Sequence, residues 1–468
     1  MRSKIMQYKK VSDNIIQELG KIVGGENVLS EDIEDYGHDE TFLLKPVLPE
    51  VVVKPKEREE VSEILKLANR EIIPVTPRGG GTGLSGGAVP IYGGILLSLE
   101  RMNRILEIDE DNFVAVLEPG VILADLYKAV EDRGLYYPVY PEEESGFIGG
   151  NVATNAGGMK AVKYGITRNY ILGLDAVLPN GTVIETGGKY VKNSTGYDLR
   201  HLLIGSEGTL AVVTKIILRL IKKPEKRCFL IPAFDDLEDA IGTVPKILKE
   251  GMLPTAIEFM LGAAMRLCQD YTGISLPIPD VANYLIIFVE GRTEAEVSDL
   301  AERISTICMG NGASDVFVVD TERDMRNVSE VRSKLGFAIK ELGSIDIGDA
   351  VVPRSKIPEF MRMLGELSEK YGLLVSGSGH AGDGNVHFAV IGVGMEEEEF
   401  MKISPDAFRD VFKSSVSLGG TISGEHGIGF IKKKYVPIAI NEAQIDLMRR
   451  IKRVFDPNCI LNPGKIFD

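Results

Sequence analysis

The sequence predicts an α+β protein with two main domains and a C-terminal segment. Its 468 residues exceed what one ordinary hydrophobic core accommodates. In the first half, β-branched runs flank a Pro-Asn-Gly-Thr turn at 179–182, which indicates antiparallel strands. After Lys222-Lys223-Pro224 the pattern changes to strands alternating with helical periodicity, which indicates a second α+β unit. We therefore expect domains over 1–224 and 225–430, with 431–468 docking back on the first.

Hydrophobic periodicity assigns the elements of the first half in chain order. Val61, Ile64 and Leu65 share one helical face, whereas 113–117 is a short continuous apolar run typical of a buried strand. The glycine- and asparagine-rich stretch 149–158 is expected to be a loop. We expect helices within 9–30, 61–68 and 121–133, and strands at 51–55, 73–77, 95–99, 113–117, 175–178, 183–185 and 210–220.

The second half repeats strand and helix patterns with a partly antiparallel order. This arrangement is typical of an α+β sandwich. The tail from Phe455 to Lys465 is rich in turn residues and is expected to dock on another domain. We expect strands at 228–231, 284–289, 313–319, 373–377 and 386–391, and helices at 237–248, 294–309, 357–371 and 405–418.

Charge and composition exclude several function classes. The hydrophobic fraction of 44% and the charged fraction of 26% are normal for a globular protein. A net charge of −15 argues against nucleic-acid partners, which require clustered Lys and Arg. The start of the chain (Met1–Ile5) has no apolar signal-peptide core, and no apolar run reaches the ~18–20 residues of a membrane span. We expect a cytoplasmic protein, with any membrane contact made through a partner.

The four cysteines are too far apart to form a cofactor motif. Cys228, Cys268, Cys308 and Cys459 form no CxxC pair. Their spacing excludes the usual iron–sulfur ligand sets and does not indicate a disulfide framework. A reducing compartment is therefore expected.

A glycine loop follows the strand at 73–77 and contains a misleading motif. Gly81, Gly83 and Gly86 match G-x-G-x-x-G, but a Rossmann fingerprint requires a helix to open at the third glycine. Here Pro90 and the Gly93-Gly94 pair follow instead. Successive glycines still allow several backbone N–H groups to converge on phosphate oxygens, and Thr82 and Ser85 add hydroxyl donors.

Two further strings in the same half have similar chemistry. Residues 145–158 mix glycine, asparagine and threonine with apolar residues, and 205–210 reads Gly-Ser-Glu-Gly-Thr-Leu. Narrow backbone surfaces of this kind suit a flat polar ring. Three such strings without a Rossmann helix predict a bound dinucleotide in a different fold.

Three of the five histidines lie in two glycine-rich strings of the second half. His380 and His387 flank the turn sequence Gly-Asp-Gly-Asn, in which Asp383 and Asn385 are expected to form the turn or to support the ligands. Glu425 would complete a His₂-carboxylate set with open positions, suited to Zn²⁺, Mn²⁺ or Fe²⁺. His426, beside it, is the best candidate base.

Two histidines and a lysine run receive ordinary structural interpretations. His38 and His201 are isolated and are expected to be structural or at the surface. Lys432-Lys433-Lys434 is expected to form a solvated face.

These strings, in this order, carry a family resemblance. The first half resembles the FAD-binding domain of the vanillyl-alcohol-oxidase/PCMH superfamily. With the histidine strings, the chain from about residue 45 to Gly464 resembles FAD-linked 2-hydroxyacid dehydrogenases of the glycolate oxidase catalytic subunit and D-lactate dehydrogenase group. The resemblance implies a PCMH-type FAD-binding domain built from two α+β subdomains and a cap domain with an antiparallel sheet.

The resemblance also implies where FAD binds. The first loop would hold the pyrophosphate, the second would line the flavin and its ribityl chain, the third would lie near the adenosine, and the tail would return to the flavin. Covalent members often carry a histidine in the first loop, and this loop has none, so we predict non-covalent FAD. The implied residues are Arg78, Gly79, Gly80, Gly81, Thr82, Gly83, Leu84, Ser85, Ser145, Gly149, Gly150, Asn151, Thr154, Asn155, Gly158, Glu207, Gly208, Val213 and Asn462.

For the reaction, the resemblance assigns His380, His387 and Glu425 to the metal and His426 to the base. Arg332 corresponds to an arginine that binds the substrate carboxylate; an exposed helix arginine is an equal alternative. Relatives acting on D-2-hydroxyglutarate carry polar residues where this chain has Gly336, Ile347 and Ala389. This difference favours a short or apolar 2-hydroxyacid over a dicarboxylate.

The sequence thus predicts an FAD- and metal-dependent dehydrogenase that oxidises a D-2-hydroxyacid or glycolate. Electrons would pass to a separate iron–sulfur subunit, electron-transfer flavoprotein, cytochrome or quinone. A homodimer is compatible with the sequence, which does not specify the oligomeric state. Three alternatives stay open: a metal-dependent hydrolase with phosphate-binding loops, a non-redox flavoprotein of the same superfamily, and an assembly subunit of a glycolate oxidase complex.

Overall fold

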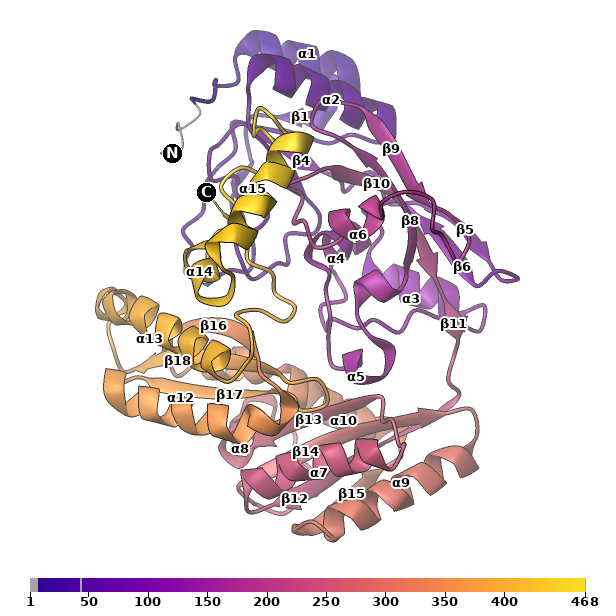
Figure 1. Cartoon of the computed structure of the whole chain (residues 1–468), viewed down its shortest axis with the longest axis vertical. Helices are drawn as coiled ribbons and strands as arrows, with labels where there is room; N and C mark the ends of the chain where they lie inside the picture. Colours follow the sequence, from indigo (N-terminus) through magenta and orange to yellow (C-terminus); the bar gives the residue numbers. More distant parts are fainter. Residues whose placement is uncertain (1–6, 43, 468) are drawn as a thin grey trace.

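A computed structural model describes residues 7–42 and 44–467 of the chain. The expectation about the first residues, Met1–Ile5, lies outside this range. Figure 1 shows two halves one above the other, with the C-terminal helix returning to the half that contains the N-terminus. Among the described residues, no helix is long and apolar enough to cross a membrane.

The first half contains two main sheets. One has the order β1 (Val28–Leu29), β2 (Val51–Val53), β4 (Ile95–Ser98), β3 (Val75–Arg78), and its β2–β4–β3 part is parallel. The other is antiparallel, in the order β5 (Ile105–Asp109), β6 (Val114–Leu117), β10 (Val212–Arg219), β8 (Ile171–Val177), β9 (Val183–Gly187). A short pair joins β7 (Leu135–Tyr136) to β11 (Ile221–Lys222). The helices are α1 (Asp13–Val23), α2 (Arg58–Glu71), α3 (Leu123–Glu131), α4 (Ile148–Thr154), α5 (Ala161–Tyr164) and α6 (Leu199–Leu203).

The predicted hairpin forms at its Asn-Gly turn. Val177 pairs with Val183, and Gly181 takes a φ of 81°, which glycine adopts without strain because it has no Cβ. One local expectation for this half is wrong. The stretch 149–158 was expected to be a loop, but its first part forms α4 because Ile148 and Val152 are one helical turn apart and both are buried.

The second half is built on a seven-stranded antiparallel sheet. Its order is β15 (Ala313–Val319), β12 (Lys226–Phe234), β14 (Asn283–Gly291), β13 (Ala256–Leu261), β17 (Leu374–His380), β18 (Asn385–Val393), β16 (Gly343–Val351). The helices are α7 (Leu237–Lys249), α8 (Gly262–Thr272), α9 (Glu294–Met309), α10 (Glu322–Ser333), α11 (Leu335–Lys340), α12 (Ile357–Tyr371) and α13 (Glu397–Ser417). This sheet, together with the sheets and helices of the first half, confirms the predicted α+β class.

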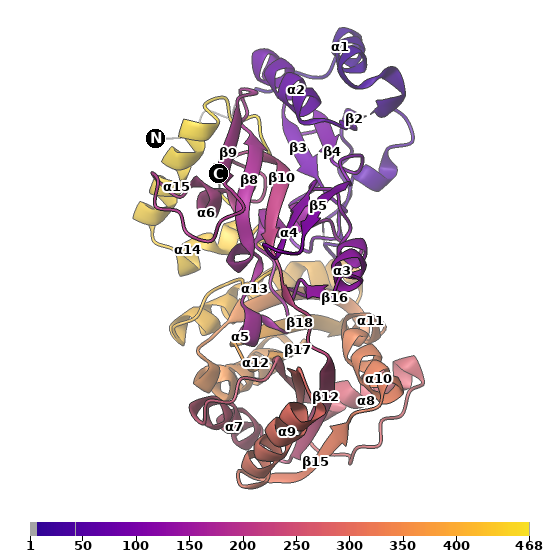
Figure 2. The same cartoon turned by 90° about the vertical axis from the view of Figure 1, so that its right-hand side faces the viewer.

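Helices cover the two faces of this sheet unequally. Buried residues of α7, α9, α12 and α13 form one continuous core with the first face. On the second face, α8, α10 and α11 pack over part of the sheet, as Figure 2 shows from the side. The rest of that face, along β16, β17 and β18, is turned toward the first half and lines a cavity. The predicted helix at 405–418 is longer than expected and continues through Pro405 from Glu397.

The C-terminal segment, with α14 (Val436–Ala439) and α15 (Glu442–Phe455), connects the two halves. Tyr435 and Ile445 belong to the core of the second half. Farther along, Leu461 forms an isolated parallel bridge with Val75 at the edge of the first sheet.

A buried ion pair fixes the segment where it meets the first half. The Lys452 ammonium donates to the carbonyl oxygens of Thr209 (2.6 Å) and Leu461 (2.8 Å) and to the Asp456 carboxylate (2.5 Å). We expect Lys452→Met to destabilise the protein by about 3–5 kcal/mol, because it leaves the fully buried Asp456 charge without its cation. Urea unfolding checks this, with Lys249→Met at the exposed end of α7 as control. A shift no larger than the control's would contradict the prediction.

Candidate functional site

A cavity of about 1040 Å³ lies between the two halves. It is lined by all three glycine-rich strings, by the histidine strings and by Asn462 from the tail. All but two of the predicted cofactor, metal and catalytic residues line it. The exceptions are Ser145, whose backbone N–H bonds the Glu143 carboxylate, and Asn155, whose side chain accepts from the N–H of Arg168.

The first glycine loop presents free donors to this cavity. Within the described part of the chain, no backbone N–H from Gly79 to Ser85 donates a hydrogen bond to the protein. Gly81 has a φ of 73°, and a Cβ there would collide with the Arg78 guanidinium. A concave set of free N–H groups suits phosphate oxygens, so the loop fits a dinucleotide pyrophosphate.

Side chains around this loop have structural partners. The Ser85 hydroxyl, expected to face an anion, instead donates to the carbonyl oxygen of His426 at 2.9 Å. Arg78 donates to the carbonyl oxygens of His38 and Asp35. These bonds attach the glycine loop to the second histidine string and to the 35–38 segment. They therefore hold the free N–H groups of the loop in fixed positions.

The second string combines a rigid support with an open surface. A Cβ on Gly149 would lie 2.6 Å from Pro119, whereas a Cβ on Gly150 would meet nothing within 4 Å. The Asn151 amide nitrogen is buried without a partner in the described chain, and this side chain lines the cavity. An orphaned donor beside an open glycine surface fits the polar edge of a bound ring system.

We expect Gly150→Val to lower FAD occupancy at least tenfold without unfolding the protein. The added side chain has no protein neighbour to displace and would project into the cofactor space. The measurement is flavin absorbance per protein after purification, with circular dichroism as the fold check. Gly365→Val, at a similarly open position on α12, is the control. Full flavin content in Gly150→Val would contradict the prediction.

The third string and the tail are joined through Glu207. Its carboxylate oxygens accept from the N–H groups of Ile428 (2.8 Å) and Gly429 (2.7 Å). Burial raises the pKa of this carboxyl group. Asn462 donates to the carbonyl oxygens of Glu207 (2.8 Å) and Gly87 (3.1 Å). Glu207 therefore holds the second histidine string against the first half.

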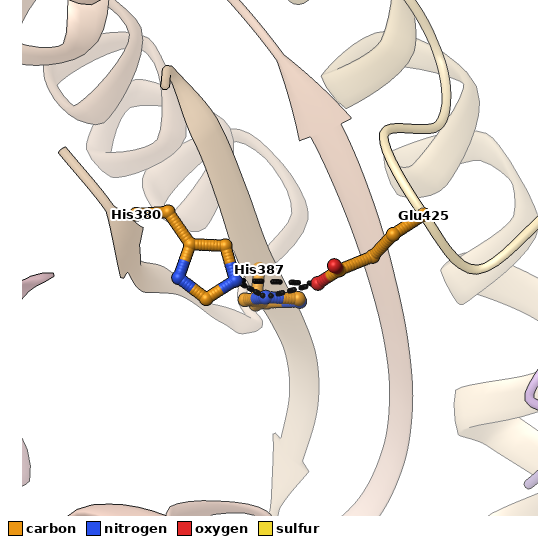
Figure 3. Close-up of side chains that lie close together, drawn as sticks. All are labelled: His380, His387 and Glu425. Carbon is orange, nitrogen blue, oxygen red and sulfur yellow. Dashed lines mark hydrogen bonds and ion pairs between the residues drawn. The ribbon is translucent and has the colours of Figure 1, made fainter. Parts of the chain in front are cut away.

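The two histidine strings bring three potential ligand atoms together. His380 ends β17 and His387 lies on β18, across the tight turn that the sequence predicts. Figure 3 shows both imidazoles and the Glu425 carboxylate converging. The Nε2 atoms are 3.2 Å apart, and Glu425 Oε1 lies 3.3 Å from His380 Nε2 and 3.1 Å from His387 Nε2.

These separations fit one divalent ion. Three ligand atoms at about 2.0–2.2 Å from a common centre are about 3.0–3.5 Å apart in tetrahedral or octahedral geometry. Two histidines and one carboxylate leave further coordination positions toward the cavity. Gly157 lies against this set, because a Cβ there would be 2.8 Å from Glu425 Oε2. The second glycine string and the histidine cluster are therefore in direct contact.

Glu258, which the sequence analysis missed, supports this cluster. It lies on β13 directly opposite His380 on β17, and its Oε1 is 2.6 Å from His380 Nδ1. This bond orients the ring so that Nε2 faces the other ligands, as carboxylate–histidine pairs do at metal sites. Burial raises the pKa of Glu258, but His380 and Arg332 outweigh it and lower the pKa to about 2. The available signal was one charged residue inside the apolar run 256–261.

Arg332, at the end of α10, lines the cavity between two carboxylates. Its guanidinium pairs with Glu258 from the second half and with Glu142 from the first. Glu142, also missed, has a φ of 68°, which is unusual for a residue other than glycine. Arg332 is therefore no free surface arginine; it joins the two halves beside the histidine cluster.

His426 lines the cavity next to Glu425 and faces Asp349, another residue that the sequence analysis missed. Its Nδ1 is 3.4 Å from Asp349 Oδ1. Burial lowers the pKa of His426 to about 4, although Asp349 opposes this shift, so the imidazole is neutral near pH 7. The ring stacks on His387 with centroids 5.1 Å apart.

Asp349 organises the second histidine string. It is fully buried, and Oδ2 accepts from the N–H groups of Gly424 (2.6 Å) and Glu425 (2.8 Å). Lys432 also pairs with it and is only 2% exposed, so the expectation of a solvated lysine face is wrong for this residue. The physical reason is that the buried Asp349 charge requires a counterion.

His38 and His201 line no part of the cavity.

Comparisons with known proteins show the family of this chain. The family model described as "FAD linked oxidases, C-terminal domain" matches residues 223–466, and the one described as "FAD binding domain" matches 49–187. The chain is 44% identical to a D-lactate dehydrogenase of Archaeoglobus fulgidus, covering 96% of this chain and 98% of that protein. It is 37% identical to the glycolate oxidase subunit GlcD of Bacillus subtilis, with 98% and 97% covered.

The fold has a solved counterpart as well. A p-cresol methylhydroxylase structure superposes with a TM-score of 0.79 at 20% identity, covering 97% of this chain and 96% of that one. This likeness concerns the fold. Together with the matches over nearly the whole sequence, it shows that the chain belongs to the FAD-linked oxidases of the vanillyl-alcohol-oxidase/PCMH superfamily, in the group that includes D-lactate dehydrogenases and glycolate oxidase subunits.

Proposed function

We propose that the chain oxidises a D-2-hydroxyacid or glycolate to the 2-oxoacid, with non-covalent FAD and a divalent ion, and passes the electrons to a separate acceptor. The observation that carries this proposal is that the His380–His387–Glu425 cluster and His426 line the same cavity as the free N–H groups of the first glycine loop. The similarity to GlcD of Bacillus subtilis, which is named as one subunit of glycolate oxidase, supports a separate acceptor.

Each group of residues would have its own role in this reaction. When bound, FAD would accept the two electrons and the ion would stabilise negative charge on the substrate hydroxyl oxygen. His380, His387 and Glu425 would hold the ion, and Glu258 would keep His380 oriented. His426 would take the hydroxyl proton, because its ring is neutral and Asp349 faces its Nδ1. Arg332 would orient the substrate carboxylate with those N–H groups that Glu142 and Glu258 do not use.

The alternatives are less well supported. A hydrolase would use the ion but not three strings that line a dinucleotide-sized cavity, and the family matches favour the flavin. An assembly subunit would not need an intact histidine cluster. The likeness to alkyldihydroxyacetonephosphate synthase, at 18% identity and a TM-score of 0.76, concerns the fold alone.

An anaerobic flavin assay tests the proposal. Purified protein should be yellow, and its flavin absorbance should bleach when D-lactate or glycolate is added. Treatment with a chelator should slow the bleaching, and a divalent ion should restore it. A colourless protein that takes up no FAD, or a flavin that no 2-hydroxyacid bleaches, would overturn the proposal. Bleaching at the same rate with and without the chelator would show that the proposed reaction does not require a metal ion.

A further inference from the structure

Beyond the ion cluster, the sheet of the second half forms an apolar trough. Side chains two residues apart on a strand share a face, so His387, Ala389 and Ile391 of β18 point the same way. All three line the cavity. On this face of β18 the polar ion cluster lies at His387, and the side chains that follow, Ala389 and Ile391, are apolar.

The neighbouring strands continue the pattern in register. Ala389 stands between Ile347 of β16 and Ser376 of β17, and Ile391 stands beside Leu374 of β17. From His387 to Ile391 the strand rises about 14 Å, at about 3.4 Å per residue. This face is therefore as long as a chain of several methylene groups, and it ends at Ile391, which is only 2% exposed.

The cover of the trough is also apolar. Leu335, Phe337 and Ile339 of α11 line the cavity opposite this face, and Gly336 between them leaves its surface open. Phe42, Ile339, Leu342 and Ile347 pack with Ala389 and Ile391 into one small hydrophobic cluster. Figure 2 shows α11 beside β16 at this edge of the sheet.

Charge is nearly absent from the trough. Of the described cavity-lining residues on α11, β16, β17 and β18 beyond the ion cluster, only Lys340 is charged. Lys340 is exposed, and its ammonium lies 5.6 Å from the centre of the Phe42 ring. It lies at the rim, where solvent screens it, so the described lining residues inside the trough offer a second carboxylate no charged partner.

We propose that the preferred substrate is a 2-hydroxyacid with an apolar side chain several carbons long, which lies in this trough. The inference rests on the proposed function, because the ion cluster and Arg332 would fix the hydroxyl and carboxylate at one end. The side chain then extends along Ala389, Ile347 and Ile391 and loses its contact with water. Neither glycolate nor D-lactate fills this space, and D-2-hydroxyglutarate would bring a charge into it.

A chain-length series on the FAD-loaded protein tests this. The probes are glycolate, D-lactate, D-2-hydroxybutyrate, D-2-hydroxyhexanoate, D-2-hydroxyoctanoate and D-2-hydroxyglutarate, and the readout is the second-order rate constant of anaerobic flavin bleaching. Burying one methylene favours the bound form about fourfold, so the constant should rise about fourfold per methylene up to the hexanoate. Thermal shifts with pyruvate, 2-oxohexanoate and 2-oxooctanoate give a second readout without turnover and should rise in the same order.

A matched pair of variants locates the effect. Ile347→Asp places a charge in the trough beside Ala389 and should lower the octanoate-to-lactate ratio at least tenfold. Val393→Asp places the same charge on an exposed position of β18 that does not line the cavity, and should leave that ratio unchanged.

The outcomes separate the inference from the proposed function. Bleaching by D-lactate or glycolate with no gain for longer chains would overturn the trough and leave the function standing. A preference for D-2-hydroxyglutarate would overturn it in favour of a carboxylate site at Lys340. If no hydroxyacid bleaches the flavin but the longer 2-oxoacids still stabilise the protein more, the proposed function fails and the apolar specificity holds.

Discussion

Replacing His426 with glutamine should lower the rate of anaerobic flavin reduction by about 10²–10⁴-fold, the usual contribution of a general base. Glutamine keeps a polar side chain of similar length but cannot take a proton at neutral pH. Because His426 makes no contact with the free N–H groups of the first glycine loop, FAD content should stay that of the unchanged protein. The measurement is stopped-flow flavin absorbance with the best substrate of the series.

The control for this variant is His201→Gln. His201 is about 40% exposed, bonds Asp198 and lies outside the cavity, so this substitution should leave the rate unchanged. Rapid flavin reduction in His426→Gln with full FAD content would remove His426 from the reaction. Loss of FAD together with activity would instead indicate a structural role of the imidazole, which stacks on His387 and faces Asp349.

Replacing Glu258 with glutamine should lower metal affinity by about 10–100-fold. The carboxylate bonds His380 Nδ1 and pairs with Arg332, so its removal loosens the orientation of one proposed ligand and leaves Arg332 with Glu142 alone. Metal content after dialysis, together with competition against a graded chelator, measures the affinity. Activity should return at high metal concentration, which a loss of folding would not allow.

Glu290→Gln is the matched control for Glu258. Glu290 is also a buried carboxylate on the same sheet, but its partners are Lys163 and the Tyr164 hydroxyl and not a histidine of the cluster. Both variants should lose stability, and only Glu258→Gln should lose metal. Equal metal content in the two would show that Glu258 does not support the ion site.

Most of the local structure was predictable where one segment carries its own periodicity. The helices at 294–309 and 357–371 and the strand at 313–319 have the predicted bounds, because their hydrophobic spacing is regular and their ends are marked by turn residues. The Asn-Gly hairpin and the tight turn between His380 and His387 could also be predicted, because neighbouring residues alone specify each turn. Within the second half, between β12 and α13, the sequence analysis did not assign α8, α10, α11, β13 and β16.

The unassigned elements carry two of the three residues that the site analysis missed; the third, Glu142, lies outside the helices and strands. Glu258 lies on β13, where it is the one acid of the strand, and Asp349 lies on β16, which also carries Asp346. Nothing in the sequence says that 256–261 pairs with 374–380, more than a hundred residues later. That pairing is a matter of sheet order, which depends on packing both faces of all seven strands at once and leaves no local pattern.

The sequence by itself determined the chemistry of this protein: glycine strings suited to a dinucleotide, a His₂-carboxylate ligand set and a neighbouring histidine. The family matches confirm the FAD-linked oxidase that these strings predict; the roles of the individual residues stay predictions. The tertiary structure decided how these groups are supported and what surrounds them. Charges buried at Glu258 and Asp349 find partners only through strand pairing, and the apolar trough exists only because β16, β17 and β18 align in register under α11. The sequence specifies which chemical groups are present and how they are spaced. The environment of each group depends on segments that meet only when the chain folds.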